Sequence, residues 1–150
     1  MNNKAGRGDK SSCPITYSLD IFGDRWSLLV LRDLILHGKT RFAEMLASDE
    51  QIASNILADR LQRLECLGLI EREPDPEDRR QKICRVTSKG LTLTPVLLEI
   101  AAWGASNDLD TGAPSGFASA FYEDRRAFYH DHRRLTAKLF EADRASKEES

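Results

Sequence analysis

The sequence lacks the features that mark membrane, secreted and metal-binding proteins. No apolar run approaches the roughly 18 residues that suggest a membrane span, and residues 1–12 lack the apolar segment of a secretory signal. Only three cysteines occur in 150 residues, widely spaced at Cys13, Cys66 and Cys84. This odd, scattered set argues against a disulfide framework or a zinc site and predicts reduced thiols. We therefore expect a cytoplasmic protein with no membrane contact, metal or cofactor.

The sequence also lacks the positive net charge that is usual in nucleic-acid-binding domains. It has 22 basic and 24 acidic residues, for a formal net charge of −2 at pH 7. The charge is unevenly distributed, however, because residues 79–89 contain no acidic side chain and these five basic ones: Arg79, Arg80, Lys82, Arg85 and Lys89. A locally basic element of this kind is compatible with a nucleic-acid interface on an otherwise neutral protein.

Hydrophobic periodicity predicts a mainly α chain with one small β-hairpin. In chain order, the expected elements are helices at 14–22, 24–36, 41–47 and 54–67, strands at 69–73 and 82–87, and helices at 88–106 and 117–145. Thr40 is expected to cap the helix at 41–47. Pro95 falls inside the helix at 88–106 and is expected either to bend it or to mark its true start.

This order places two short helices joined by a turn directly before a hairpin, which is the winged helix-turn-helix arrangement. The chain then divides into four segments: a disordered segment 1–12, a winged helix-turn-helix DNA-binding domain 13–107, a linker 108–116, and a C-terminal helix 117–150 with a dimerisation or accessory role. The first helix and the helix around Trp103 carry more apolar surface than so small a module can bury. We therefore expect dimerisation helices at both ends.

The second helix of the pair, 54–67, is expected to enter the major groove, where each base pair displays a distinct donor and acceptor pattern. Asn55 in its first turn is the best candidate for direct readout, because an Asn amide can bond adenine bidentately. The start of the preceding helix could clamp a phosphate, and the hairpin tip could reach the neighbouring backbone or minor groove. The candidate DNA-binding residues are Lys39, Thr40, Arg41, Ser54, Asn55, Ala58, Asp59, Arg63, Arg79, Arg80 and Lys82.

Seven segments of the chain resemble the HxlR family of winged-helix regulators, which is related to the MarR family. They are CPI (13–15), GDRWSLLVLR (23–32), RFAEM (41–45), SNILADRL (54–61), LGLI (67–70), VTSKG (86–90) and AAWG (101–104). The resemblance implies a DNA-binding homodimer whose first and last helices form the interface. The wing, 75–80, also resembles that of MarR proteins, and the tail after Asn107 is longer than the family core requires.

Cys13 is the candidate redox sensor. The resemblance implies this role, because some HxlR members use a cysteine immediately before the first proline to sense oxidants or electrophiles. A thiol at a helix N-terminus also has its thiolate favoured by the helix dipole, which lowers the thiol pKa. The alternative is a structural thiol packed at the dimer interface. Cys66 and Cys84 are both expected to be packing residues.

Two other classes of function are alternatives to a DNA-binding regulator: an enzyme and a protein-binding module. No nucleophile elbow, phosphate loop or metal-ligand cluster occurs in the sequence, so we expect no enzyme. A winged-helix module that binds protein instead of DNA is the alternative, and the basic stretch 79–89 favours DNA. The sequence therefore favours a repressor or activator, with a repressor preferred, that binds double-stranded DNA at a palindromic operator as a dimer. It leaves open a response to an oxidant, an electrophile or a small-molecule effector.

Overall fold

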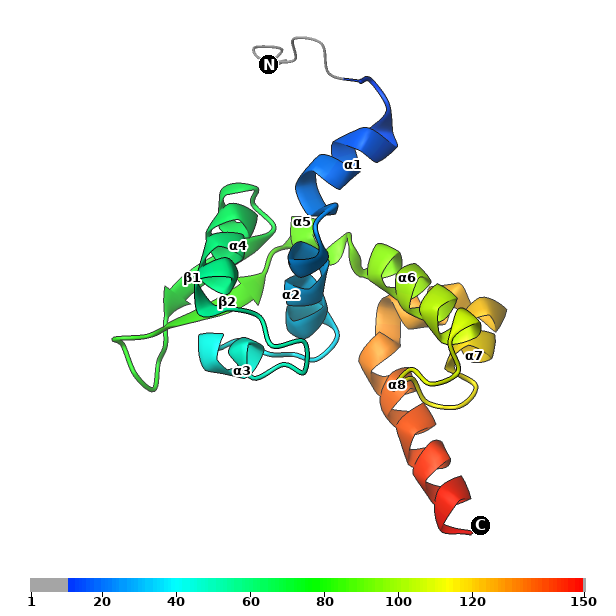
Figure 1. The fold of residues 1–150 in the computed structure, drawn as a ribbon. Coiled ribbons are helices and arrows are strands. Elements are labelled where there is room, and N and C mark those ends of the chain that lie inside the picture. The colour runs from blue at the N-terminus through cyan, green and yellow to red at the C-terminus, as the bar shows by residue number, and fades with distance from the viewer. Residues whose placement is uncertain (1–10, 150) are drawn as a thin grey trace.

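The computed structural model describes residues 11–149, which form eight helices and a two-stranded hairpin (Figure 1). The elements are α1 (Pro14–Phe22), α2 (Arg25–Ile35), α3 (Phe42–Leu46), α4 (Ser54–Cys66), β1 (Ile70–Pro74), β2 (Lys82–Val86), α5 (Ser88–Leu91), α6 (Thr94–Asn107), α7 (Phe117–Glu123) and α8 (Arg125–Glu148). The disorder expected for residues 1–12 concerns mostly residues outside the described range. No helix within residues 11–149 is both long and apolar enough to cross a membrane.

Helix α2 is the centre of the main hydrophobic core, as its apolar sequence indicates. It begins after Asp24, whose carboxylate accepts hydrogen bonds from the Ser27 backbone N–H at 3.0 Å and the Ser27 hydroxyl at 2.6 Å. Its buried apolar residues are Val30, Leu31, Leu34 and Ile35. Helix α4 packs on α2 through leucines at four- and three-residue spacing, namely Leu57, Leu61 and Leu64.

The start of α3 differs from the expectation that Thr40 caps it. The helix begins one residue later, at Phe42, and the Thr40 side chain forms no cap. Instead, the Glu44 carboxylate reaches back and accepts hydrogen bonds from the backbone N–H groups of Thr40, at 2.9 Å, and Arg41, at 3.0 Å. As in a capping box, the Glu44 carboxylate bonds N–H groups just before the helix. These are not the first-turn N–H groups that a Thr40 hydroxyl would bond.

The hairpin and the helices after it follow the sequence closely. Strands β1 and β2 are antiparallel, with Ile70 opposite Val86 and Pro74 opposite Lys82. Pro95 lies in the first turn of α6, where its missing N–H costs nothing. Of its two expected effects, Pro95 therefore marks the true start of α6, and the short helix α5 precedes it.

The single C-terminal helix expected from Phe117 is wrong, because the chain breaks at Asp124 into α7 and α8. The Asp124 carboxylate caps α8 by accepting from the Ala127 N–H at 3.1 Å. The break folds α8 back, so that the Phe128 ring contacts those of Phe117 and Phe121, with ring centroids 5.8 and 5.7 Å apart. With residues of α6, these rings form a second hydrophobic core separate from the first.

Candidate nucleic-acid interface

The first two turns of α4 present a polar, solvent-exposed face. Four of the candidate residues lie there and all are exposed: Ser54, Asn55, Ala58 and Asp59. Ala53 precedes the helix and supplies no side-chain cap, so the first backbone N–H groups of α4 receive no hydrogen bond from a capping side chain. The face therefore offers side-chain donors and acceptors together with the positive end of a 13-residue helix.

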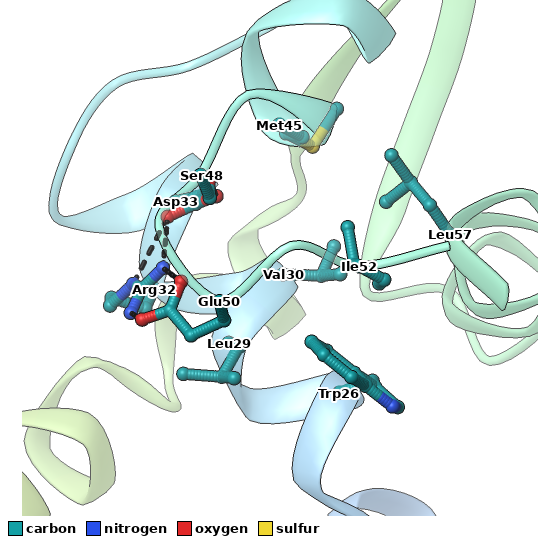
Figure 2. Close-up of a pocket in the computed structure, with 10 residues that line it drawn as sticks. All are labelled: Trp26, Leu29, Val30, Arg32, Asp33, Met45, Ser48, Glu50, Ile52 and Leu57. Atoms are coloured by element: carbon teal, nitrogen blue, oxygen red, sulfur yellow. Dashed lines mark hydrogen bonds and ion pairs between the residues drawn. The ribbon is translucent and has the colours of Figure 1, made fainter. Parts of the chain in front are cut away.

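The turn between α3 and α4 is fixed to α2 by a buried carboxylate, Asp33, which is only 3% exposed. Asp33 accepts hydrogen bonds from Arg32 Nη2 at 2.8 Å and Ser48 Oγ at 2.5 Å. Arg32 also donates to Glu50 at 2.5 and 2.9 Å (Figure 2). Lys39 joins the same group, with its Nζ atom 2.6 Å from Ser48 Oγ and 3.3 Å from Asp33 Oδ2. These contacts set the position from which α4 starts.

Figure 2 shows this polar network beside the apolar side chains of Trp26, Leu29 and Ile52. The enclosed space measures about 10 Å³, which is near the minimum volume for one water molecule. Burial opposes ionisation of Asp33, but hydrogen bonds from His37, Ser48 and Arg32 outweigh it and lower the pKa of Asp33 below its usual range. The region is therefore a packed structural unit in which the carboxylates of Asp33 and Glu50 are paired with Arg32 and Lys39, and it leaves no room for a ligand.

A second set of polar contacts joins α4 to the start of α2 and the end of α1. The Arg60 Nε atom donates to Asp24 Oδ2 at 2.8 Å, while Arg63 Nη1 lies 3.6 Å from Asp24 Oδ1. Arg63 also donates to the Asp20 carbonyl. Although burial opposes ionisation of Asp24, hydrogen bonds from Ser27 and Arg60 lower its pKa to about 2. Arg63, a predicted DNA contact, thus takes part in an internal bridge.

The wing is fastened to the entry of α3 by another buried carboxylate, Asp75, which is 2% exposed. Arg41 donates from Nε to Asp75 at 2.7 Å and from Nη2 to Glu77 at 2.9 Å. Asp75 also accepts from the Glu77 backbone N–H at 2.9 Å. The Arg41 guanidinium and these hydrogen bonds lower the pKa of Asp75 below its usual range. Asp75 thus anchors the wing to the start of α3.

The basic residues at the tip of the wing remain exposed. Within residues 11–149, Arg80 is paired only with nearby Asp78, at 3.1 Å, and its side chain is 91% exposed. Arg79 and Lys82 are exposed, and neither forms an ion pair with a residue in the range 11–149. Helix α4 contacts β1 directly, so this helix and the hairpin lie side by side (Figure 1).

The predicted contacts therefore divide into two groups. Seven face solvent: Ser54, Asn55, Ala58, Asp59, Arg79, Arg80 and Lys82. Four take part in internal contacts that hold the module together: Lys39, Thr40, Arg41 and Arg63. Sequence reasoning missed Asp33 and Asp75 as anchors. A lone aspartate within an apolar helix was a usable signal for Asp33, whereas nothing local marked Asp75, whose partner is 34 residues away.

The three cysteines occupy different environments. Cys13 immediately precedes α1 and is partly exposed, and the nearby backbone N–H groups of Thr16 and Ile15 lower the pKa of its thiol. Cys84 is buried, as expected, and burial raises its pKa. Cys66 was expected to be a packing residue, but it is exposed, because it lies at the end of α4 on the side away from the core.

Comparison with known proteins bears directly on this arrangement. The family described as HxlR-like helix-turn-helix matches residues 21–110, which contain α2 to α6, the exposed face of α4 and the wing. The HTH-type transcriptional regulator YybR of Bacillus subtilis, itself uncharacterised, is 31% identical over 99 residues, which are 66% of this chain and 78% of YybR. YodB of the same organism, also an HTH-type transcriptional regulator, is 33% identical over 92 residues, covering 61% and 81% of the two chains.

Solved structures agree with the sequence matches. The redox regulator HypR in its reduced form superposes with a TM-score of 0.57 at 30% identity, covering 63% of this chain and 93% of HypR. The quinone-bound structure of YodB gives a TM-score of 0.51 at 29% identity, covering 63% and 99%. The family match at residues 21–110 contains the winged helix-turn-helix module, including α4. This chain therefore belongs to the HxlR-like helix-turn-helix family and is a transcriptional regulator of the helix-turn-helix type.

Proposed function

We propose that this protein binds double-stranded DNA in a sequence-specific manner, with α4 in the major groove and the wing on the neighbouring backbone or minor groove. The observation that carries the proposal is the division of its polar side chains. The polar residues at the start of α4 and the basic residues at the wing tip face solvent, while the side chains behind them are engaged in internal ion pairs. A fixed frame that leaves one polar and locally basic surface free is suited to base and phosphate contacts.

The functional unit is a homodimer on a palindromic operator. Helix α1 contains no buried residue and extends away from the rest of the chain (Figure 1). Its apolar side chains are open to solvent, with Ile15 68% exposed, and Trp103 on α6 is 67% exposed. Large apolar surfaces of this kind on a soluble regulator favour burial against a second copy. Two-fold symmetry would place two α4 helices about 34 Å apart on successive major grooves.

The test is fluorescence anisotropy with the DNA fragment upstream of the protein's own gene, at several salt concentrations. Affinity should fall with salt, with a slope of about −0.9 per phosphate contact on logarithmic axes. Asn55→Ala should reduce discrimination between operator and unrelated DNA by about tenfold, since a bidentate base contact is worth about 1–3 kcal/mol. Gln62→Ala, an exposed change farther along α4, is the matched control and should have little effect.

Light scattering on the same sample should give the mass of two chains. Binding that does not vary with salt, or no binding to this fragment or to pooled genomic fragments, would instead favour a winged-helix module that contacts protein. Equal losses from Asn55→Ala and Gln62→Ala would remove Asn55 from the base-reading role while leaving DNA binding itself intact.

A response to oxidants or electrophiles through Cys13 is a second part of the proposal. Cys13 combines partial exposure with a lowered thiol pKa, and YodB has been solved with a bound quinone. Iodoacetamide should label Cys13 faster than Cys66 near pH 7, because the thiolate is the reacting form. Buried Cys84 serves as the internal control and should stay unlabelled in the folded protein. Labelling of Cys66 ahead of Cys13 would contradict a sensor role for Cys13.

A further inference from the structure

A cavity of about 330 Å³ lies between the helix-turn-helix module and the tail. Its walls come from the end of α2 and the loop after it, from β2 and α5, and from α8. Leu34, Val86 and Leu91 contribute apolar surface, while Lys39, Arg85 and Arg133 contribute positive charge. None of the ten residues that line the cavity is acidic. The volume falls in the range of small-molecule sites.

Arg133 of α8 is the residue that connects the tail to this cavity. Its Nε and Nη2 atoms donate to the Ile35 carbonyl at 3.0 and 2.8 Å, and Nη2 also donates to the Leu34 carbonyl at 3.2 Å. The guanidinium thus satisfies carbonyls at the C-terminal end of α2, where a positive charge is favoured. These contacts fix the guanidinium in place without neutralising it, since Arg133 pairs with no carboxylate in the range 11–149.

Gly38 shows how closely the guanidinium approaches the loop after α2. Its φ is +67°, and a Cβ atom at this position would lie 3.4 Å from Arg133 Nη1. The Nη1 group forms no hydrogen bond within the described residues, so its two N–H donors remain available to a ligand. The other two cations already have acidic partners, because Lys39 lies beside Asp33 and Arg85 pairs with Glu73 at 2.5 Å. Arg133 is therefore the main unneutralised charge of the cavity.

We infer that this cavity is a binding site for a small organic anion, with its acid group toward Arg133 and Lys39 and its apolar body against Leu34, Val86 and Leu91. A guanidinium with free N–H donors suits a carboxylate, and the apolar wall favours an aromatic or alicyclic body over a fully hydrated ion such as phosphate. The lining contains no acidic side chain, and the unneutralised charge of Arg133 disfavours a cationic ligand by repulsion.

The cavity lies against two parts of the DNA-binding module, the loop before α3 and strand β2. The Thr40 carbonyl, in the loop that leads to α3, accepts the Cys84 N–H of β2 at 2.8 Å. A ligand in the cavity would contact this loop and this strand together. Any effect on DNA affinity rests on the proposed function, whereas binding of the anion does not, so the two can fail separately.

The experiment is isothermal titration calorimetry of the full chain, without DNA, with 1-naphthoate as the probe. Its neutral analogue 1-naphthamide and inorganic phosphate are the comparison ligands. We expect saturable binding of naphthoate at one site per chain, and at least about tenfold weaker binding of both comparison ligands. No saturation below about 10 mM naphthoate, or equal affinity for naphthamide, would overturn the inference, because the positive lining would then have no role. Equal affinity for phosphate would overturn the assignment of an apolar body.

Variants then separate ligand binding from the structural role of Arg133. Arg133→Gln should weaken naphthoate binding about tenfold, while Arg133→Lys, which keeps the charge, should retain most of it. The matched control is Arg134→Gln on the same helix, which is paired with Asp131 and does not line the cavity. Equal binding by Arg133→Gln and the parent chain would contradict the site.

Arg133→Gln could also undock α8 from α2, so a second variant changes the cavity without removing the Arg133 contacts. Leu91→Asp places a carboxylate at the rim of the cavity, at a residue that is 51% exposed, and leaves the Arg133 contacts to α2 intact. It should weaken naphthoate binding by repulsion while leaving the thermal unfolding midpoint nearly unchanged. Unchanged affinity in Leu91→Asp would show that naphthoate binds elsewhere and would overturn the inference.

Discussion

The helix-turn-helix module and the C-terminal tail each have a hydrophobic core, but buried carboxylates add ion pairs to the core of the module. In the module, three carboxylates connect elements that are distant in sequence: Asp24 joins α2 to α4, Asp33 joins α2 to the α3–α4 turn, and Asp75 joins the wing to α3. In the tail, the second core is built from aromatic rings on α7 and α8 against α6. The module thus uses directional hydrogen bonds between distant elements, whereas the second core relies on non-directional packing of rings.

This difference has a functional consequence. A helix that reads bases must sit in one position relative to the wing, and hydrogen bonds with fixed geometry define such a position better than apolar contacts do. The tail needs only to cover one face of α6 and to dock on α2, for which aromatic packing and the Arg133 contacts suffice. Three changes would test this contrast.

The largest effect is expected from Phe121→Ala in the tail. Phe121 is fully buried between two other rings, and removal of a buried phenylalanine side chain typically costs about 3–5 kcal/mol. Hydrogen exchange should show loss of protection in α7 and α8, with α2 and α4 still protected. The neighbouring exposed residue gives the control, Tyr122→Ala, which should cost less than about 1 kcal/mol in urea unfolding. Equal loss of protection in α4 would show that the two cores unfold as one.

Asp33→Ala should produce a somewhat smaller loss of stability but a different pattern. It leaves Arg32, Lys39 and Ser48 without a shared partner in a buried position, and breaking such a network costs about 3 kcal/mol. Protection from exchange should fall in the α3–α4 turn, and DNA affinity should fall with it. Asp49→Ala, an exposed change in the same turn, is the control. Full DNA affinity in Asp33→Ala would contradict the role of this network in placing α4.

The smallest effect is expected in the dependence of the free energy of unfolding on acid pH. Hydrogen bonds from Arg32 lower the pKa of Glu50 to about 2, against about 4.3 for an unfolded chain. A depressed carboxyl pKa contributes stability that is fully present above about pH 4.3 and is lost as pH falls toward 2. The free energy of unfolding in urea should therefore drop less between pH 5 and pH 3 in Glu50→Gln than in the parent chain. The difference should be at most about 1 kcal/mol, because Glu50 is partly exposed.

For Glu50→Gln, the exposed strand residue Glu71 provides a control through Glu71→Gln, which should leave the pH dependence of the parent chain unchanged. An equal reduction in both variants would mean that the acid sensitivity reflects overall charge instead of the Arg32–Glu50 pair. Together, the three substitutions test whether loss of an ionic contact destabilises only the module and loss of an aromatic contact destabilises only the tail.

Local patterns in the sequence predicted most of the fold. The leucine spacing identified α4 and its buried face, and Asp24 identified the start of α2. Pro95 was expected to bend a helix or to mark its start, and the structure shows the second. These predictions succeeded because helix periodicity and capping depend on residues within a few positions of each other. The single helix predicted over 117–145 is wrong because both halves have helical sequence. The Asp124 cap and the packing of Phe128 on Phe117 and Phe121 together favour a break at Asp124.

The sequence by itself therefore determined the order of the elements, the exposed polar face of α4 and the basic composition of the wing. Only the tertiary structure decided which charged residues remain available to a partner. Arg41 and Arg63 are as basic as Arg79 and Arg80, yet the first two are engaged with groups on other elements. The physical reason is that an ion pair depends on distance in space, and the partner of Arg41 is 34 residues away in the chain.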